Sequence, residues 1–213
     1  MSQLRITEIF VSLQGESNTV GLPTVFIRLT GCPLRCVYCD TEYAFSGGEK
    51  MSIESILQQL SELRINRVCV TGGEPLAQAA CTELLRRLCD AGYEISLETS
   101  GALDISAVDP RVVRVIDLKT PGSGEVSKNR LTNLDCLRES DQLKFVISGR
   151  DDYEWSKAML KDYALEGECE ILFSPVHGKQ NPTQLAEWIL QDRLNVRFQM
   201  QLHKLLWNDQ PGR

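Results

Sequence analysis

Three cysteines within eight residues constrain the fold of this chain more than any other feature. Cys32, Cys36 and Cys39 are spaced C-x3-C-x2-C, directly after the apolar run 25–29, which predicts a buried strand. A glycine and a proline in this segment favour a loop over a helix, so the three thiolates can surround one soft metal centre. A structural zinc site or an ordinary electron-transfer cluster normally has four protein ligands. Three cysteines therefore predict a 4Fe–4S cluster in which one iron stays open to a small molecule.

Two other interpretations of these cysteines stay open. One is a zinc loop completed by a distant fourth ligand, and the other is a chance grouping in a chain with eight cysteines. No signal segment precedes the patterned sequence, so we expect the cytoplasm, where cysteines bind metals rather than form disulfides. The five cysteines outside the loop are predicted to be small core residues: Cys69, Cys81, Cys89, Cys136 and Cys169.

The acidic balance argues against a direct nucleic-acid partner. The chain has a net charge of −6 and no basic cluster, whereas nucleic-acid-binding domains usually present a basic face. A tRNA-binding enzyme is therefore not expected. The apolar runs are too short to span a bilayer, so no membrane partner is expected either. The chain has 213 residues, 42% of them hydrophobic, and we expect a single domain over residues 1–213.

Strand-like runs alternate with helical patterns along the chain, which predicts an α/β fold with mainly parallel strands. After an extended amino-terminal strand at 4–13, we expect strands at 24–30, 68–71, 93–99, 112–118, 142–148, 169–174 and 195–201. Helices are expected at 52–63, 78–91, 130–139, 151–165 and 182–192. A closed eight-unit barrel usually needs about 250 residues. We therefore expect a partial, open (β/α) barrel with about six or seven mainly parallel strands.

A second motif follows the expected strand at 68–71. In Thr71-Gly72-Gly73-Glu74-Pro75, the glycines let backbone groups approach a ligand closely. The carboxylate of Glu74 can accept a charge-assisted hydrogen bond from an ammonium group. Such a turn on its own is usually structural. Its place at the carboxyl end of a strand, where ligands of α/β sheets bind, supports a functional role.

The cysteine loop and this turn together resemble the radical S-adenosylmethionine (radical SAM) enzymes. The resemblance implies a 4Fe–4S cluster on Cys32, Cys36 and Cys39 that cleaves S-adenosylmethionine held by its amino and carboxyl groups. It also implies an S-adenosylmethionine site formed by Tyr38, Asp40, Gly73, Glu74, Ser100, Asp117, Leu118, Lys119 and Ser174. Taken singly, most of these residues are typical of helix caps or solvated loops.

A narrower resemblance covers nearly the whole chain. Its carrying segments are Leu13-Gln14-Gly15-Glu16, residues 26–32, Cys39-Asp40-Thr41, residues 71–75, residues 98–101, residues 144–146 and residues 201–204. Together they resemble the 7-carboxy-7-deazaguanine synthase family of queuosine and 7-deazapurine biosynthesis. The resemblance implies a lyase that converts 6-carboxy-5,6,7,8-tetrahydropterin to 7-carboxy-7-deazaguanine with loss of ammonia. It also implies a flavodoxin-like reducing partner and a homodimer.

This resemblance assigns further residues by position. The pterin would be bound by Leu13, Gln14, Gly15, Arg28, Thr71 and Pro211. Arg28 would pair its guanidinium with the substrate carboxylate, and Thr41 would ligate Mg²⁺ beside it. The final residues, 211–213, would fold back over the pocket. His177 and His203 receive no role, because a structural hydrogen bond explains a loop histidine equally well.

Two further function classes remain open on the sequence alone. Another radical SAM enzyme, such as a glycyl-radical activase, would have to engage a protein backbone, which Arg28 and Thr41 in a pterin-binding context argue against. A non-catalytic zinc or Fe–S protein would have a fourth protein ligand and would not cleave S-adenosylmethionine.

Overall fold

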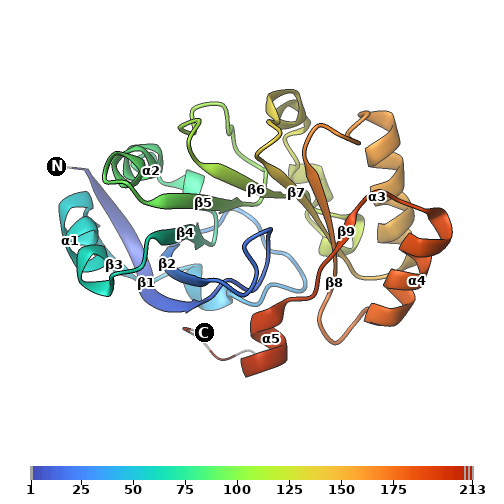
Figure 1. The fold of residues 1–213 in the computed structure, drawn as a ribbon, viewed down its shortest axis with the longest axis horizontal. Helices are drawn as coiled ribbons and strands as arrows, with labels where there is room; N and C mark the ends of the chain where they lie inside the picture. The colour runs from blue at the N-terminus through green and yellow to red at the C-terminus, as the bar shows by residue number, and fades with distance from the viewer. Residues whose placement is uncertain (1, 209, 211, 213) are drawn as a thin grey trace.

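One sheet organises the described residues, 2–208, 210 and 212, in the computed structural model (Figure 1). Its nine strands have the order β3-β1-β2-β4-β5-β6-β7-β8-β9. They are β1 (Gln3–Leu13), β2 (Pro23–Leu29), β3 (Glu49–Ser52), β4 (Arg67–Gly72), β5 (Glu94–Thr99), β6 (Val113–Asp117), β7 (Gln142–Ile147), β8 (Glu170–Pro175) and β9 (Arg197–Phe198). The strands β2 and β4 to β9 run parallel, and β1 runs antiparallel to β2 and β3. The two edge strands β3 and β9 do not pair with each other, so the sheet is open.

This topology confirms the expected open α/β fold with mainly parallel strands. The parallel part has seven strands, and β1 is the expected amino-terminal strand. The total of nine among the described residues exceeds the expected six or seven because β1 and β3 extend the sheet. The short strand β3 has the polar sequence Glu-Lys-Met-Ser, which carries no alternating apolar signal. It forms because it pairs with the start of β1, from Gln3↔Ser52 to Ile6↔Glu49.

Helices pack against the two ends of the sheet. They are α1 (Ile53–Leu63), α2 (Cys81–Asp90), α3 (Arg150–Asp162), α4 (Pro182–Asp192) and α5 (Leu202–Trp207). In Figure 1, α1 and α2 lie beside the amino-terminal strands, whereas α3 and α4 lie beside β7 and β8. Each pair covers its own apolar core, one around Ile27 and Val70 and the other around Phe145 and Phe173. The fifth helix, α5, lies apart from both cores, near the carboxyl terminus.

Alternation along β2 delivers the first site residues. Val25, Ile27 and Leu29 are fully buried in the core under α1 and α2. Because successive side chains of a strand point to opposite faces, Phe26 and Arg28 point the other way. Both of them line the cavity described below. The same strand thus builds the core and the binding wall.

Helix boundaries follow local signals where those signals exist. Ser52 caps α1 as expected, since its Oγ accepts a hydrogen bond from the amide of Ser55 at 3.1 Å. Pro182 occupies the first turn of α4, as expected. The helix expected from residue 78 begins at Cys81, because a 3-10 turn, η2 (Pro75–Ala77), precedes it. Three further 3-10 turns are η1 (Glu42–Ala44), η3 (Pro121–Ser123) and η4 (Val126–Lys128).

Three expectations were wrong, each because tertiary contacts decide the local structure. The segment expected as a helix at 130–139 is a 3-10 helix, η5 (Leu131–Cys136), held by the buried Asn133 side chain, which donates to the carbonyls of Gly101 and Leu103. The strand expected at 195–201 has two residues, because the chain then turns into the unexpected helix α5.

The third error concerns a cysteine. Cys136 is exposed rather than part of the core, whereas Cys69 and Cys81 are buried and Cys89 and Cys169 are partly buried.

The longest described helix, α3, has 13 residues, and no described helix is long and apolar enough to cross a membrane.

Candidate functional site

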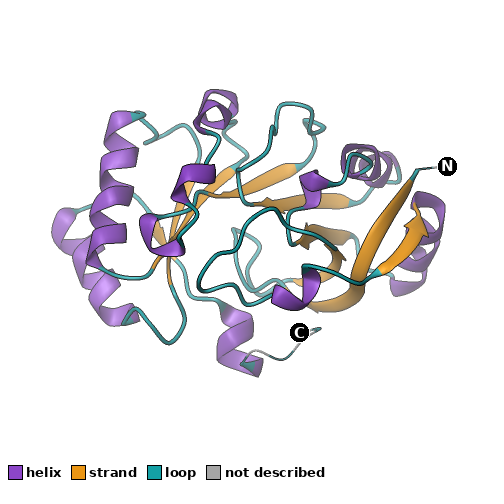
Figure 2. Cartoon of the chain, turned by 180° about the vertical axis from the view of Figure 1, so that it is seen from behind, coloured by secondary structure: helices purple, strands orange, loops and turns teal. Residues whose placement is uncertain are grey.

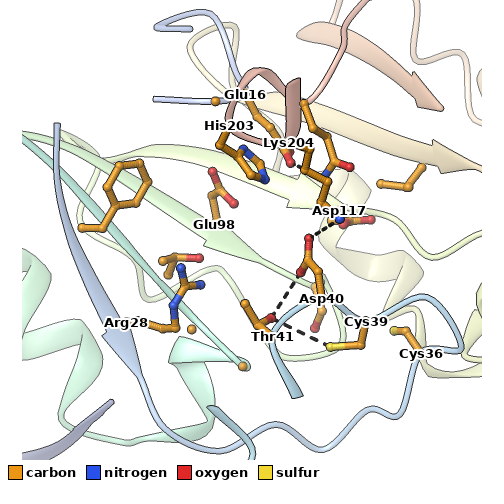
Figure 3. A pocket seen from close by; sticks show the side chains of 18 of the residues that line it. Glu16, Arg28, Cys36, Cys39, Asp40, Thr41, Glu98, Asp117, His203 and Lys204 are labelled. Carbon is orange, nitrogen blue, oxygen red and sulfur yellow. Dashed lines mark hydrogen bonds and ion pairs between the residues drawn. The ribbon is translucent and has the colours of Figure 1, made fainter. Parts of the chain in front are cut away.

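A cavity of about 470 Å³ opens at the carboxyl ends of the parallel strands (Figure 3). One side is the cysteine loop, residues 31–41, which follows β2. The ends of β4 to β7 form the floor, and the loop after β1 forms another side. The segment 199–208, which we name the closing segment, includes α5 and completes the wall. Figure 2, seen from behind, shows α5 apart from the helices that cover the two ends of the sheet. A cavity is therefore present at the strand ends, where the sequence predicted the ligand site.

Contacts from outside the cysteine loop hold it in place. The amide of Val37 donates to the carbonyl of Ser123 at 3.0 Å, and the amide of Arg35 donates to Glu125 at 2.7 Å. Leu34 is 2% exposed and anchors the loop in the protein. Contacts with the rest of the protein therefore fix the path of the loop on both sides of Cys36.

The donor set fits an iron–sulfur cluster. Cys32, Cys36 and Cys39 are partly buried and line one cavity, and no other cysteine lines it. Burial raises the pKa of the Cys32 and Cys36 thiols, so a bound cation is needed to stabilise their thiolates at neutral pH. Among the described residues, no group of three or more His, Cys, Asp or Glu side chains is placed to hold a single metal ion. Three thiols that face one cavity are a donor set that a 4Fe–4S cluster with one open iron can take.

The glycines of the second motif allow it to pack against the cysteine loop. A Cβ atom at Gly72 would lie 2.3 Å from the carbonyl oxygen of Leu29. A Cβ at Gly73 would lie 2.3 Å from the carbonyl oxygen of Gly31 and 2.7 Å from Cβ of Cys32. No side chain larger than hydrogen fits at either position without moving the backbone. The turn and the metal-binding loop are therefore one packed unit.

The carboxylate of Glu74 does not lie where the sequence placed it. It is fully buried and does not line the cavity, so direct contact with a bound ammonium group is not supported. Its oxygens accept hydrogen bonds from Thr99 Oγ1 at 2.9 Å, from the Ser100 amide at 2.7 Å and from the Leu76 amide at 3.0 Å. Glu74 therefore organises the turn after β5, and Ser100 lines the cavity in its place.

Two other residues assigned to S-adenosylmethionine also lie outside the cavity lining. Leu118 is 2% exposed and packs in the core beside β7, and its amide donates to the carbonyl of Lys144 at 2.9 Å. Ser174 is 1% exposed, and its hydroxyl donates to the carbonyl of Gln199 at 2.7 Å. Both residues support neighbouring strands instead. The assigned residues that do line the cavity are Tyr38, Asp40, Gly73, Ser100, Asp117 and Lys119.

The side of the cavity next to the cysteine loop carries two charged groups and a phenol. Lys119 Nζ lies 3.0 Å from Asp117 Oδ2, while the other oxygen of Asp117 is buried without a hydrogen-bond partner among the described residues. Burial raises the pKa of Tyr38 to about 12, and its hydroxyl donates to the carbonyl of Val146 at 3.3 Å. Tyr38 is therefore a neutral wall and Asp117 an available acceptor.

Arg28 lies on the other side of the cavity and is held in a fixed orientation. Its Nε donates to Glu8 Oε1 at 2.7 Å, and its guanidinium lies between the rings of Phe10 and Tyr43, at 5.6 and 5.8 Å from their centroids. Burial is the largest single influence and lowers the pKa of Arg28, but the hydrogen bond to Glu8 and the nearby acidic groups of Tyr43, Glu8 and Asp40 together raise it above its usual value. Phe10 stacks on Phe26 with centroids 5.1 Å apart. This corner presents a cation beside flat apolar surfaces. Of the other substrate assignments, Leu13, Gln14, Gly15 and Thr71 line the cavity, and Pro211 lies outside the described residues.

Gly15 is required by a close contact within the protein. A Cβ at Gly15 would lie 2.1 Å from Nδ1 of His203. The carbonyl of Gly15 accepts a hydrogen bond from the amide of Leu202 at 2.9 Å. The glycine thus lets α5 dock against the loop after β1.

Thr41 and both histidines face the cavity. Thr41 Oγ1 lies 3.8 Å from Cys39 Sγ and 3.5 Å from Asp40 Oδ1 (Figure 3). His177 and His203, which received no role from the sequence, line the cavity too, and burial lowers the pKa of His203. Tail residues also line it: Asn208, Gln210 and Gly212. Of the final residues 211–213, which were predicted to fold back over the pocket, Gly212 lines the cavity, and residues 211 and 213 lie outside the described residues.

A group of buried charges lies in segments that carry the family resemblance, but the sequence did not assign these residues to the site. Glu16, Glu98 and Lys144 line the cavity, and Lys144 Nζ lies 2.5 Å from Glu16 Oε2. Burial raises the pKa of Glu98. One sequence signal was available, namely a lysine in the otherwise apolar run Leu143–Ile147. It indicates a buried charge but does not identify its partners.

Comparisons with known proteins agree with this geometry. A family model described as the radical SAM superfamily matches residues 26–117, which include the cysteine loop and the glycine turn. The chain is 45% identical over 208 residues to a 7-carboxy-7-deazaguanine synthase of Chlorobaculum tepidum, which covers 96% of this chain and 94% of that protein. It is 41% identical over 219 residues to one of Koribacter versatilis, covering 96% and 97%.

Solved structures give the same result. QueE from Escherichia coli matches with a TM-score of 0.76 and 25% identity, covering 94% of this chain and 95% of that one. Streptococcus suis SuiB bound to S-adenosylmethionine matches with a TM-score of 0.57 and 16% identity, over 80% of this chain and 45% of that one, and shows likeness of fold alone. The cysteine loop, the glycine turn and near full-length similarity to curated relatives agree, and the chain belongs to the 7-carboxy-7-deazaguanine synthase family of radical SAM enzymes.

Proposed function

We propose that this protein is a radical SAM lyase that converts 6-carboxy-5,6,7,8-tetrahydropterin to 7-carboxy-7-deazaguanine with release of ammonia. The observation that carries this proposal is the shared cavity, in which three thiols and the Arg28 guanidinium face the same space. When bound, the 4Fe–4S cluster and S-adenosylmethionine supply the one-electron chemistry that activates the pterin. The residues of the chain bind both molecules, orient them and exclude water.

S-adenosylmethionine would bind on the cysteine side of the cavity. Cys32, Cys36 and Cys39 would hold the cluster, and the backbone at Gly73 packs against Gly31 and Cys32 of the same loop. The free oxygen of Asp117 is an acceptor for an ammonium group. Cavity-lining groups available to the rest of the molecule are Tyr38, Asp40, Ser100 and Lys119.

The opposite side suits a carboxypterin. Arg28 offers its two terminal nitrogens to the substrate carboxylate, since Glu8 binds its Nε. The aminopyrimidinone ring of a pterin carries N–H donors, and the carboxylates of Glu16 and Glu98 are acceptors in the same cavity. Phe10 and Phe26 offer ring surfaces for stacking. Further contacts would come from Leu13, Gln14, Gly15 and Thr71.

Mg²⁺ would bind at Thr41, between the cysteine loop and the substrate carboxylate. A hard cation held by one protein oxygen, the substrate and water is ordinary for magnesium. It would orient the carboxylate and offset its charge. We expect EDTA treatment to lower the rate of product formation and added Mg²⁺ to restore it.

Three further features complete the proposal. The enzyme would receive its electron from a flavodoxin-like partner, act as a homodimer and work in the cytoplasm. The single nine-stranded sheet supports treating residues 1–213 as one domain. The closing segment walls the cavity with His203 and Lys204, which supports a small molecule over a protein substrate.

The test is an anaerobic incubation of cluster-loaded protein with S-adenosylmethionine, dithionite, Mg²⁺ and carboxytetrahydropterin, followed by mass spectrometry. We expect 7-carboxy-7-deazaguanine. In Arg28→Gln we expect 5′-deoxyadenosine with little product, because the carboxylate loses its cation. Arg86→Gln, which removes an exposed arginine on α2, is the matched control.

Two outcomes would contradict the proposal in different ways. Formation of 5′-deoxyadenosine without deazaguanine in the wild type would leave a radical SAM enzyme with another substrate. Absence of both products, from protein with full iron and sulfide content, would indicate a non-catalytic carrier.

A further inference from the structure

Carboxylates from three separate elements share one region of the cavity wall. Glu16 follows β1, Glu98 lies on β5 and Asp117 ends β6, and all three face the same pocket in Figure 3. Lys144 on β7 lies among them. Its Nζ is 2.5 Å from Glu16 Oε2 and 3.6 Å from Asp117 Oδ2. One ammonium group therefore connects the proposed pterin side to the proposed S-adenosylmethionine side.

The sheet fixes the position of Lys144. Every residue of β7, from Gln142 to Ile147, is buried, and Lys144 pairs in register with Asp117 of β6. Lysine is rarely buried without a partner, because an ammonium group removed from water needs a compensating charge. Packing alone would be served as well by an apolar side chain. The lysine is therefore explained by the carboxylates around it.

We propose that Lys144 is a positioning residue for the pterin, which keeps the Glu16 carboxylate ionised and directed at the ring N–H groups of the substrate. This inference rests on the proposed function and adds to it, because it names the group that sets the charge state of the substrate wall. The second contact, to Asp117, ties that wall to the site of S-adenosylmethionine. Lys144 acts through these carboxylates and need not touch either molecule.

Electrostatics around Glu16 support this role. Burial alone would raise the pKa of Glu16, but Lys144 foremost and then His203 lower it to about 2. Glu98 and Asp40 also face Glu16, and their negative charges oppose its ionisation. Without the lysine, burial and these two acids would raise the pKa of Glu16. A protonated Glu16 would present a donor to the N–H donors of the substrate and lose an acceptor.

The hydrogen bond from Gln201 makes the orientation specific. Gln201 Nε2 donates to Glu16 Oε1 at 2.7 Å, while Lys144 binds Oε2. The two donors bind different oxygens of one carboxylate, so the plane of the carboxylate is fixed. Replacing the lysine by a neutral side chain removes one of these hydrogen bonds together with the positive charge. Replacing it by arginine removes neither the charge nor the capacity to donate.

The test compares Lys144→Met and Lys144→Arg with the wild-type holoenzyme, measuring kcat and KM for carboxytetrahydropterin across a pH series. For Lys144→Met at pH 7 we expect kcat/KM to fall roughly 10- to 100-fold, mainly through KM. The acidic limb of the kcat/KM profile should move to higher pH by about one unit or more. The yield of 5′-deoxyadenosine per deazaguanine should rise. Lys144→Arg should retain the wild-type acidic limb.

A matched control and a double mutant separate this role from general stability. Lys157→Met removes the ion pair between Lys157 of α3 and Asp192 of α4, outside the cavity, and should leave the profile unchanged. Glu16→Gln should lose the same limb, and the Lys144→Met/Glu16→Gln double mutant should be no worse than the poorer single mutant, because both changes remove one interaction.

Different outcomes contradict the inference about Lys144 and the proposed function. If the wild type makes product but Lys144→Met keeps both its KM and its acidic limb, or if the two losses add, the inference is wrong. If the wild type makes no product, the proposed function fails instead. If Lys144→Met does not fold, Glu16→Gln and Lys144→Arg decide, and a Glu16→Gln enzyme with wild-type kinetics would overturn the inference.

Discussion

The cysteine loop and the closing segment lie on the same cavity, but they are held in different ways. The loop begins at the end of a core strand, buries Leu34 and packs against backbone through Gly73. The closing segment docks mainly by polar contacts with two loops, with α5 outside both apolar cores. Its contacts include Gln201 with Glu16 at 2.7 Å and Lys204 with Asp40 at 2.9 Å. The cysteine loop is thus held by close packing, as in a protein core, whereas the closing segment is held mainly by polar contacts, as in many protein interfaces.

This difference has an energetic consequence. Packed backbone approaches leave no room for alternatives, so the loop has one arrangement. Polar contacts that are partly exposed contribute about 1 kcal/mol or less each, so they can be exchanged for contacts with water or with a ligand. We therefore expect the cysteine loop to be rigid and the closing segment to open at lower cost. Opening at that segment would give a substrate access to the cavity.

The largest predicted effect is on the cysteine side. Replacing Cys32, Cys36 or Cys39 singly by alanine should abolish 5′-deoxyadenosine formation, because a cluster held by two thiolates is not retained. Iron and sulfide content, together with the visible absorption of the reconstituted protein, measure this loss. Cys136→Ala is the control, since that cysteine is exposed and lies outside the cavity lining. Full activity in any of the three loop variants would remove the cluster assignment.

A smaller loss is predicted at the turn that supports the loop. In Glu74→Gln an amide group replaces one carboxylate oxygen and faces the donors of Thr99 and Ser100. Leaving such buried groups unsatisfied costs about 1–3 kcal/mol. We expect lower thermal stability and a higher KM for S-adenosylmethionine, with cluster content retained. If only the pterin KM changed, Glu74 would belong to the substrate side instead.

These two sides also differ in how far the sequence predicted them. The cysteine spacing, the glycine turn and the strand ends are local signals, and the structure brings Cys32, Gly73, Ser100 and Asp117 to one cavity as expected. The local signal misled at Glu74, because its carboxylate is satisfied by residues 25 and 26 positions later in the chain. Sequence shows that a carboxylate is present, but not which donors surround it.

On the substrate side the missing information is long-range. The contact of Gln199 with Ser17 joins residues 182 positions apart, and Lys144 meets Glu16 across 128 positions. No periodic pattern records such pairs. The helix α5 was missed for the same reason, since its first amide is satisfied by Gly15 and no side-chain cap marks its start.

Gly15→Ala tests the docking of the closing segment and should have an intermediate effect. The added Cβ would overlap Nδ1 of His203, so α5 has to shift away. We expect a several-fold rise in the KM for the pterin and faster amide exchange at Leu202, with S-adenosylmethionine cleavage retained. Hydrogen exchange followed by mass spectrometry reports the helix directly.

A second change checks the cause of this shift. Gly15→Ala combined with His203→Ala removes the overlapping ring, so the exchange at Leu202 should slow again even where activity stays low. If exchange in Gly15→Ala matched the wild type, the glycine would serve the ligand rather than the helix.

The smallest effect is predicted for Lys204→Met. The ion pair between Lys204 and Asp40 is partly exposed at the aspartate, whose side chain is 37% exposed, so its loss should cost about 1 kcal/mol or less. The pair joins the closing segment to the cysteine loop. We expect unchanged cluster content and a small rise in the pterin KM. The difference in KM between the variant and the wild type should shrink at high salt, because screening weakens the ion pair of the wild type. A loss of cluster or a tenfold fall in S-adenosylmethionine cleavage would show that the loop depends on the closing segment, and the contrast between a core-like and an interface-like side would not hold.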